Sequence, residues 1–486
     1  MALDVGVALA AIGAGAAIGL AGIGSGIGVG ITGAAGAGAV AEDPSKFGTS
    51  IVFQALPQTQ AIYGLLTAIL ILMGVGLLGG GNPQASIPTG LAALGAGIAV
   101  GLAGLSAIGQ GISAASGVGA AVSNPDMFGK GMVYSVLPET QAIYGLLVAI
   151  LLMISSPILG STELGLPAGL TALGCGLAIG IAGLSAIGQG IAAGSGIGAT
   201  TEKPEMFGRG MVYSVLPETQ AIYGLLVAIL LMVGTGILGG EARGLPDSVG
   251  IVSIGCGLAI GIAGLSAIGQ GMAAGSGIGA TASKPEMFGR GMVFSVLPET
   301  QAIYGLLVAI LLMIGVGILG GGGVVDNIGL VHGLTAIGCG MAIGLAGLSA
   351  IGQGIAAAAG VGGTAEKPEI LGRGMVFSVL PETQAIYGLL VAILMMIGVG
   401  ILGDPSKGLG LGAEVGLASI GAGAAIGFAG LSGIGQGITA AGGIAAAVRD
   451  STTMGKSLVL AVMSETFAIF GLLIAILIMY GIGFFG

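Results

Sequence analysis

Five glutamates recur in stretches of sequence that are otherwise apolar. The first, Glu139, is the only formally charged residue between Met132 and Leu159, and it stands in the segment Leu-Pro-Glu-Thr-Gln-Ala-Ile-Tyr. A carboxylate inside a membrane helix is costly, and it is therefore a functional-site candidate by default. The equivalent carboxylates are Glu218, Glu299, Glu382 and Glu465. This recurrence predicts an intramembrane binding or transport site rather than a structural accident.

A glutamine in the context Gly-Gln-Gly precedes each of these glutamates by 29 residues. Between Gln110 and Glu139 the turn signal Pro125 lies almost midway, 15 residues after the amide and 14 before the carboxylate. Two antiparallel helices joined at that turn place both side chains at the same depth in the membrane. The five amides are Gln110, Gln189, Gln270, Gln353 and Gln436.

Helix geometry separates each glutamate from the Thr-Gln-Tyr set that follows it. At about 100° per residue, Glu139 lies roughly 200° from Gln141 and roughly 140° from Tyr144 around the helix, so they face different neighbours. We predict that the Glu of each hairpin uses the Thr-Gln-Tyr set of the preceding hairpin. These sets are Thr59, Gln60 and Tyr63; Thr140, Gln141 and Tyr144; Thr219, Gln220 and Tyr223; Thr300, Gln301 and Tyr304; and Thr383, Gln384 and Tyr387.

The first and last repeats depart from this pattern in complementary ways. The first has Gln58 at the Glu position and Val29 or Gly28 at the Gly-Gln-Gly position, and the last has Phe467 and Phe470 where the others have Gln and Tyr. With the pairing given above, all of these losses fall on one junction, between the last hairpin of one chain and the first of the next. The sequence therefore predicts five working sites per chain and one dead junction.

The ligand types suggest a cage for an ion. One carboxylate, two amide oxygens and a threonine hydroxyl are hard oxygen ligands that suit a small hard cation. One negative charge balances one positive charge, so a loaded site is neutral and tolerates lipid. The kinks expected at Pro57, Pro138, Pro217, Pro298 and Pro381 free backbone carbonyls nearby. A proton would need only the Glu, and the sequence leaves both cargoes open.

These sites are embedded in six internal repeats, and repeats of this size define the fold. The chain has 486 residues, of which 55% are hydrophobic and 7% charged, which excludes an ordinary soluble domain. Each repeat has two long apolar segments, so we predict an all-α membrane protein with twelve transmembrane helices in six tandem hairpins. The predicted hairpins are 1–83 (hairpin 1, which lacks the Glu), 84–164 (hairpin 2), 165–243 (hairpin 3), 244–326 (hairpin 4), 327–405 (hairpin 5) and 406–486 (hairpin 6).

The two segments of a repeat differ in bulk. The odd segments are rich in Gly, Ala and Ser with small residues at four-residue spacing, which lets helix backbones approach closely. Such helices suit the inner circumference of a ring and the bulkier even helices suit the outer one; a compact bundle packed through glycine is the alternative. Segments of about 30–35 residues reach roughly 50 Å, so we expect them to project from one face of a membrane core about 30 Å thick.

The distribution of basic residues predicts the orientation. Ten of the twelve Lys and Arg lie in the loops inside hairpins, and only Arg243 and Lys407 lie between hairpins. By the positive-inside rule, we expect a multi-pass protein of the cell membrane with the intra-hairpin loops in the cytoplasm and both termini outside. The net charge of −9 gives no reason to expect nucleic acid as a partner.

Three cysteines, Cys175, Cys256 and Cys339, stand at equivalent places where other repeats have Ala96 and Ala422. Replacement of Ala by Cys favours a small packing residue over a metal ligand or a disulfide. No cofactor is expected, apart from the transported Na+ or H+.

The hairpins, the glycine-rich first helix and the Leu-Pro-Glu-Thr-Gln-Ala-Ile-Tyr motif resemble the c/K proteolipid subunit of rotary V/A-type ATPases and ATP synthases, over essentially the whole chain. The resemblance implies a non-catalytic subunit with no ATP site, forming with further copies of itself a rotor ring in membrane lipid. It also implies a stator subunit of the a/I type, whose Arg displaces the ion, and central-stalk subunits at the cytoplasmic loops.

The resemblance further implies roles within the site. In sodium-coupled members, the Glu, the first-helix Gln, the Thr and Gln of the adjacent hairpin and the carbonyl of the Leu before Pro hold the ion, while the Tyr bonds to the Glu. The carbonyl role thereby falls on Leu56, Leu137, Leu216, Leu297 and Leu380. Hairpin 6 departs from the pattern at Met463 and Ser464 as well as at its two phenylalanines.

Two other classes of protein remain alternatives at this stage. A secondary transporter or channel could be built from repeats, although transporters usually gather one or two central sites from broken helices. A structural proteolipid pore without energy coupling is the other.

Overall fold

The computed structural model describes residues 4–79, 82–239, 244–320 and 327–485. Within these residues every regular element is helical, and twelve helical spans are long and apolar enough to cross a membrane. The prediction of an all-α membrane protein with twelve spans is therefore confirmed. Arg243 and the predicted hairpin boundaries at 243 and 326 lie outside the described residues.

The spans alternate along the chain between an odd and an even type. The odd spans are α1 (Val5–Glu42), α4 and α5 (Ile87–Ala103, Ala107–Ser123), α8 and α9 (Leu166–Ala182, Ala186–Glu202), α12 and α13 (Asp247–Ala263, Ala267–Ser283), α16 and α17 (Leu330–Ala346, Ala350–Glu366), and α21 and α22 (Ala413–Gly430, Ser432–Arg449). The even spans are α2 and α3 (Phe47–Ala55, Thr59–Gly74), α6 and α7 (Met127–Val136, Thr140–Ile154), α10 and α11 (Met206–Val215, Thr219–Gly234), α14 and α15 (Met287–Val296, Thr300–Gly315), α18 and α19 (Leu371–Val379, Thr383–Gly398), and α23 and α24 (Met454–Val462, Thr466–Gly481). The short helix α20 (Ser406–Leu409) precedes the last odd span.

The even spans tighten at the proline motif. Leu137–Glu139 is a 3-10 turn between α6 and α7, and the same turn recurs at the equivalent place in each hairpin. In hairpins 1 to 5 the central residue of this turn is proline, which has no N–H and crowds the preceding turn of a helix. In hairpin 6 the turn Met463–Glu465 forms with Ser464 in that place.

Four odd spans tighten as well, which the sequence analysis did not anticipate. In the first of them Gly104–Ser106 is a 3-10 turn between α4 and α5, whereas α1 is continuous. This turn lies at a close contact between neighbouring odd helices, since a Cβ on Gly183 would lie 2.9 Å from Cα of Ala103.

The odd spans pack against one another in chain order, backbone to backbone. A Cβ at Gly190 of α9 would overlap the carbonyl oxygen of Gly109 in α5, and a Cβ at Gly271 would overlap that of Gly188 in the same way. No rotation of a side chain can clear a backbone carbonyl, so only glycine fits at these places. The small residues of the odd segments thus create a continuous layer of six helices.

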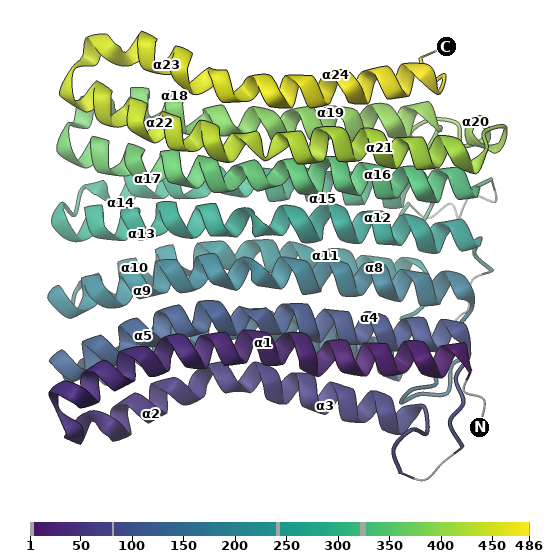
Figure 1. Cartoon of the computed structure of the whole chain (residues 1–486), viewed down its shortest axis with the longest axis horizontal. Coiled ribbons are helices and arrows are strands. Elements are labelled where there is room, and N and C mark those ends of the chain that lie inside the picture. Colours follow the sequence, from purple (N-terminus) through teal and green to yellow (C-terminus); the bar gives the residue numbers. More distant parts are fainter. Residues whose placement is uncertain (1–3, 80–81, 240–243, 321–326, 486) are drawn as a thin grey trace.

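The even spans lie on the other face of this layer. In Figure 1 the odd helices face the viewer and α11, α15 and α19 lie behind them, while α3 and α24 lie beyond the two ends of the layer. The layer is therefore curved, with the odd helices on its concave side. Exposed Ile143, Leu147 and Ile154 on the even helix α7 give the convex side an apolar surface suited to lipid.

The closed and open ends of the hairpins lie at opposite ends of the array. The turns inside hairpins all lie at one end of the array, and the described ends of the chain lie at the other (Figure 1). Every hairpin therefore enters and leaves from the same side.

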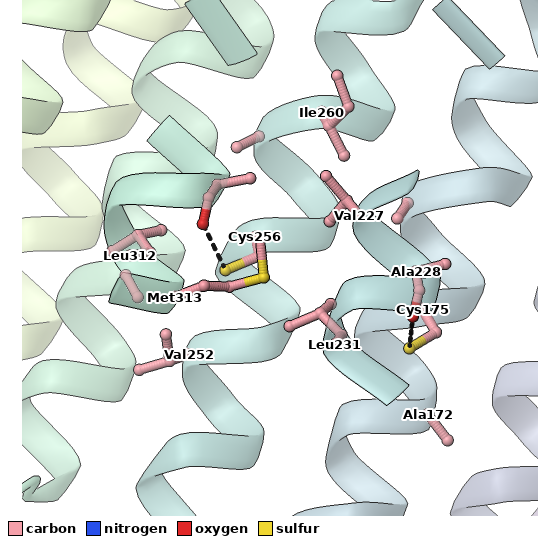
Figure 2. Packing of buried hydrophobic residues seen from close by; sticks show 14 of the residues in the cluster. Ala172, Cys175, Val227, Ala228, Leu231, Val252, Cys256, Ile260, Leu312 and Met313 are labelled. Atoms are coloured by element: carbon pink, nitrogen blue, oxygen red, sulfur yellow. Dashed lines mark hydrogen bonds between the residues drawn. The ribbon is translucent and has the colours of Figure 1, made fainter. Parts of the chain in front are cut away.

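Buried apolar residues fill the space between the two layers. Figure 2 shows Cys175 and Cys256 among Val227, Leu231 and other members of this cluster. Each thiol is fully buried and donates to a backbone oxygen of the even helix of its own hairpin, Cys175 to Ala228 at 3.4 Å. The cysteines are packing residues, as the sequence predicts.

Substitution of a layer glycine tests this packing. Gly190→Ala should destabilise the purified protein by about 1–3 kcal/mol, because the new methyl group meets a backbone carbonyl. Gly198→Ala is the matched control, because nothing lies near a Cβ there and alanine favours a helix by up to about 1 kcal/mol. Thermal unfolding in detergent measures both, and equal stabilities would contradict the backbone contact.

Candidate functional site

The local backbone places each glutamate at the end of a 3-10 turn. Glu139 closes the turn Leu137–Glu139 and immediately precedes α7, and its side chain caps no backbone N–H of that helix. Pro138 within the turn is buried. The carboxylate is thus free to reach sideways, into the space between hairpins 1 and 2.

Both oxygens of the Glu139 carboxylate accept hydrogen bonds. Oε1 accepts from the Tyr63 hydroxyl at 2.7 Å, and Oε2 accepts from Nε2 of Gln110 at 3.2 Å. Gln110 belongs to the same hairpin as Glu139, whereas Tyr63 belongs to the preceding one. The site is therefore built by two consecutive hairpins, in the sense that the sequence predicts.

The remaining polar groups continue this network. Nε2 of Gln60 donates to Oε1 of Gln110 at 2.7 Å, and both amides are fully buried. The Thr59 hydroxyl lies 3.1 Å from Oε1 of Gln60 and 3.1 Å from the carbonyl oxygen of Leu56. One hydroxyl proton thus faces two acceptors, which leaves a cluster of oxygen lone pairs without a full set of protons.

The same arrangement occurs five times along the array. The Tyr–Glu distance is 2.7 Å for Tyr144–Glu218 and Tyr223–Glu299, and 2.6 Å for Tyr304–Glu382 and Tyr387–Glu465. The Gln–Glu distance is 3.1 Å for Gln189–Glu218, 3.2 Å for Gln270–Glu299, 3.1 Å for Gln353–Glu382 and 3.3 Å for Gln436–Glu465. The pairs Gln141–Gln189, Gln220–Gln270, Gln301–Gln353 and Gln384–Gln436 repeat the bond between amides. Thr140, Thr219, Thr300 and Thr383 donate to Leu137, Leu216, Leu297 and Leu380.

The residues that break the pattern lie on the two open edges of the array. Phe467 and Phe470 of hairpin 6 are 61% and 56% exposed, and Gln58 of hairpin 1 is exposed at the opposite edge. At the five internal junctions the residue equivalent to Phe467 is a fully buried Gln. The structure therefore brings together all the predicted residues at five junctions and leaves the altered ones unpaired at the edges.

The charge of the carboxylate is not balanced by its hydrogen-bond donors. The phenol and the amide that contact Glu139 are neutral. A carboxylate among apolar helices needs either a proton or a cation. The arrangement can thus take up and release one positive charge per site, and the nearby oxygen cluster suits a metal cation as well as hydrogen bonding.

The structure adds a set of hydroxyl groups that the sequence analysis missed. A buried serine hydroxyl stands one helical turn before each Gln of the Gly-Gln-Gly motif and has no hydrogen-bond partner among the described residues. These serines are Ser106, Ser185, Ser266, Ser349 and Ser432. The sequence pattern that could have revealed them is a serine four residues before each Gln of the Gly-Gln-Gly motif.

A curved array of six two-helix membrane units, five of which carry one carboxylate between neutral donors, defines a proteolipid that carries ions. Six segments of the chain, 12–71, 85–152, 173–231, 254–312, 337–395 and 420–478, match the family model for the C subunit of ATP synthase. The chain belongs to this family, and it is a rotor-ring proteolipid of the ion-translocating A/V-type rotary ATPases. The alternatives of a repeat-built transporter and of a pore without energy coupling are thereby set aside.

Three relatives illustrate the likeness. The chain is 57% identical over 234 residues to the K subunit of the A-type ATP synthase of Methanocaldococcus jannaschii, which covers 48% of this chain and 97% of that protein. It is 36% identical over 133 residues to the K subunit of the V-type sodium ATPase of Enterococcus hirae, covering 27% of this chain and 80% of the relative. It is 36% identical over 123 residues to the c subunit of the V-type proton ATPase of Candida tropicalis, covering 24% and 74%. Relatives named for sodium and for protons both occur, so the likeness leaves the ion open.

The pairing of the hairpins can be tested one site at a time. Tyr63→Phe removes one hydrogen-bond partner from Glu139 and leaves this carboxyl less restrained, so it should react roughly tenfold faster with a carbodiimide. Labelling of Glu218 should not change. Tyr144→Phe is the matched control and should act on Glu218 alone. Peptide-resolved mass spectrometry measures both, and an effect of Tyr144→Phe on Glu139 would contradict the pairing.

Proposed function

We propose that this chain carries Na+ on five intramembrane glutamates and couples ion flow to rotation of a membrane ring. The observation that carries the proposal is the oxygen cluster beside each of the five carboxylates. A proton carrier needs only the Glu and its hydrogen bonds, whereas this site adds a Thr hydroxyl, a backbone carbonyl and two amides. Such hard ligands suit Na+, and H+ is the alternative cargo.

In the proposed cage the first site is made by two consecutive hairpins. Glu139 and the amide oxygen of Gln110 come from hairpin 2, and Thr59, Gln60 and the carbonyl of Leu56 come from hairpin 1. Tyr63 holds the carboxylate without touching the ion. The same roles fall on the corresponding residues of the other four sites. One Na+ neutralises one carboxylate, which allows a loaded site to face lipid.

The proposed cycle needs three further partners. Several copies of this chain close a ring in the lipid, and a stator subunit of the a/I type supplies an Arg that displaces the ion. Central-stalk subunits bind the loops inside hairpins. Moving one charge across 100 mV is worth about 2.3 kcal/mol, and this work becomes torque.

The orientation is proposed from charge. The turns inside hairpins lie at one end of the array, and ten of the twelve basic residues lie in these turns or in the adjoining ends of the helices. By the positive-inside rule this end faces the cytoplasm, and both termini face the outside of the cell membrane.

A chain with five sites in six hairpins changes the coupling ratio. A ring of a given size then carries fewer ions per turn, so each ATP is coupled to fewer ions. Such a ratio favours pumping against a steep gradient and requires a larger driving force for synthesis.

Carbodiimide labelling of the purified ring near neutral pH tests the cargo. With Na+ as cargo, millimolar sodium should protect all five glutamates, because only a protonated, unoccupied carboxyl reacts. Gln189→Leu should weaken protection at Glu218 and leave Glu139 unchanged, because it removes one amide from one site. Labelling that follows pH alone and ignores sodium would show that the amides and the Thr serve a proton carrier.

Equilibrium binding of radioactive Na+ tests the number of sites. Saturation should reach five ions per chain, since hairpin 1 has Gln58 at the Glu position. Gln58→Glu alone should not raise the number to six, because Val29 replaces the first-helix Gln at this junction, and Phe467 and Phe470 replace its second Gln and its Tyr. Six ions per wild-type chain would contradict the dead junction.

A further inference from the structure

An aromatic side chain joins each hairpin to the next near the end that holds the turns. Phe53 of hairpin 1 is fully buried in a socket between α5 and α6 of hairpin 2. Two glycines make the socket: a Cβ on Gly117 would overlap the Phe53 ring, and one on Gly131 would lie 3.3 Å from it. The aromatic ring of Phe53 thus occupies the space that larger side chains at positions 117 and 131 would fill.

The same aromatic contact occurs at the four other internal junctions, always from a hairpin to its successor. The pairs are Tyr134 with Gly196 and Gly210, Tyr213 with Gly277 and Gly291, Phe294 with Gly360 and Gly374, and Phe377 with Gly443, near which Ser457 takes the place of the second glycine. All of these aromatic residues are fully buried. A hairpin therefore presents a bulky side chain to one neighbour and a socket to the other.

One socket and one bulky side chain remain unmatched, on opposite edges of the array. The socket of hairpin 1 is an open groove of about 220 Å³ lined by Gly36, Ser50 and Phe47 among others. The position in hairpin 6 that corresponds to Phe53, five residues before the Glu position, is Leu460, which is 58% exposed. Ser50 corresponds to Ser457 of hairpin 6, and a Cβ on Gly443 would lie 2.6 Å from the Phe377 ring and 3.1 Å from Ser457.

A second contact runs in the opposite direction at the other end of the hairpins. Ile158 of hairpin 2 covers Gly74 at the end of α3, and Ile318 and Ile401 cover Gly234 and Gly315 in the same way. At each edge of the array, one residue of this second contact again lacks its counterpart. Leu77 is 36% exposed at the position of Ile158 in hairpin 1, and nothing lies near a Cβ on Gly481 at the end of α24.

We propose that hairpin 6 of one copy of this chain docks on hairpin 1 of a second copy through these two contacts. Leu460 enters the groove at Gly36 and Ser50, and Leu77 of the second copy covers Gly481 of the first. This inference rests on the proposed ring of copies, but it does not depend on which ion the ring carries.

A second copy is the occupant because the internal junctions show the geometry. All five are heterologous contacts with one direction, and the unmatched halves on the edges continue that direction. Repeated heterologous contacts of this kind close into a ring when the rotation permits. Leu460 is smaller than the aromatic residues that it replaces, so the junction between copies buries less apolar surface than the five internal ones.

Cross-linking tests the first contact. A chain in which Cys175, Cys256 and Cys339 are replaced by Ala would carry Leu460→Cys and Ser50→Cys and react in membranes with dibromobimane, a short bifunctional thiol reagent. The expected products on a denaturing gel are multimers, with a peptide that joins positions 460 and 50. Each single-cysteine chain should remain monomeric. Phe377→Cys with Ser457→Cys is the matched control, which should link within one chain and leave its mass unchanged.

The other outcomes separate this contact from the ring itself. Links between two copies of position 50 or two of position 460 would overturn the proposal, as would a link from position 460 to a different polypeptide. Absence of links in a sample whose native mass is that of a multimer would overturn the docking contact and leave the ring intact. A native mass of one chain would overturn both.

Substitution of the docking residue gives a second test. Leu460→Phe restores the side chain of the internal junctions and should shift the dissociation of the multimer in detergent to a higher temperature. Leu460→Asp should lower that temperature or abolish the multimer, while the labelling of Glu299, at the junction of hairpins 3 and 4 in the middle of the chain, reports that the chain still folds. Unchanged dissociation in both variants would overturn the proposal.

Discussion

Contact between glycine backbones of neighbouring odd helices is the constraint on which the rest of the structure depends. Lipid offers no hydrophobic drive for helix association, so packing and hydrogen bonds must supply it. The contact between Gly190 and Gly109 holds two hairpins at a spacing that no side chain could maintain. At this spacing the Tyr144 hydroxyl lies 2.7 Å from Glu218, and the aromatic side chains reach their sockets. A slightly wider layer would lose all of these contacts together.

The carboxylate depends on that spacing for a different reason. Its two oxygens accept from neutral groups on two different hairpins, so the site exists only where the hairpins touch. Neutral donors orient the carboxylate without cancelling its charge, and the apolar surroundings penalise the charge. A site of this kind is neutral in its apolar surroundings only with one positive charge, either a proton or a cation. The fixed spacing of the hairpins and the uncompensated charge of the carboxylate therefore occur together at each of the five internal junctions.

Much of the site could be predicted because its information lies within single helices. The 29-residue interval from Gln110 to Glu139 fixes their common depth, and the angle between Glu139 and Tyr144 assigns them to different neighbours. The 3-10 turn at Gly104–Ser106 was missed, because it arises from contact between helices, which no single helical pattern reveals. The cargo could not be predicted for a chemical reason: the same Gln and Tyr can hold a protonated carboxyl by hydrogen bonds or frame a cation.

The altered residues at the two edges gain a common explanation if copies join through hairpins 6 and 1. Five junctions lie within one chain and are held by covalent continuity and by a buried aromatic ring, whereas the sixth joins separate molecules through Leu460. A carboxylate at that junction would lose its donors whenever the two copies moved apart, and would remain as an uncompensated charge in lipid. Gln58, Phe467 and Phe470 remove this liability, because a neutral amide and two apolar rings tolerate a looser contact. The junction between copies, which has the fewest constraints, is thus the junction that lacks a carboxylate.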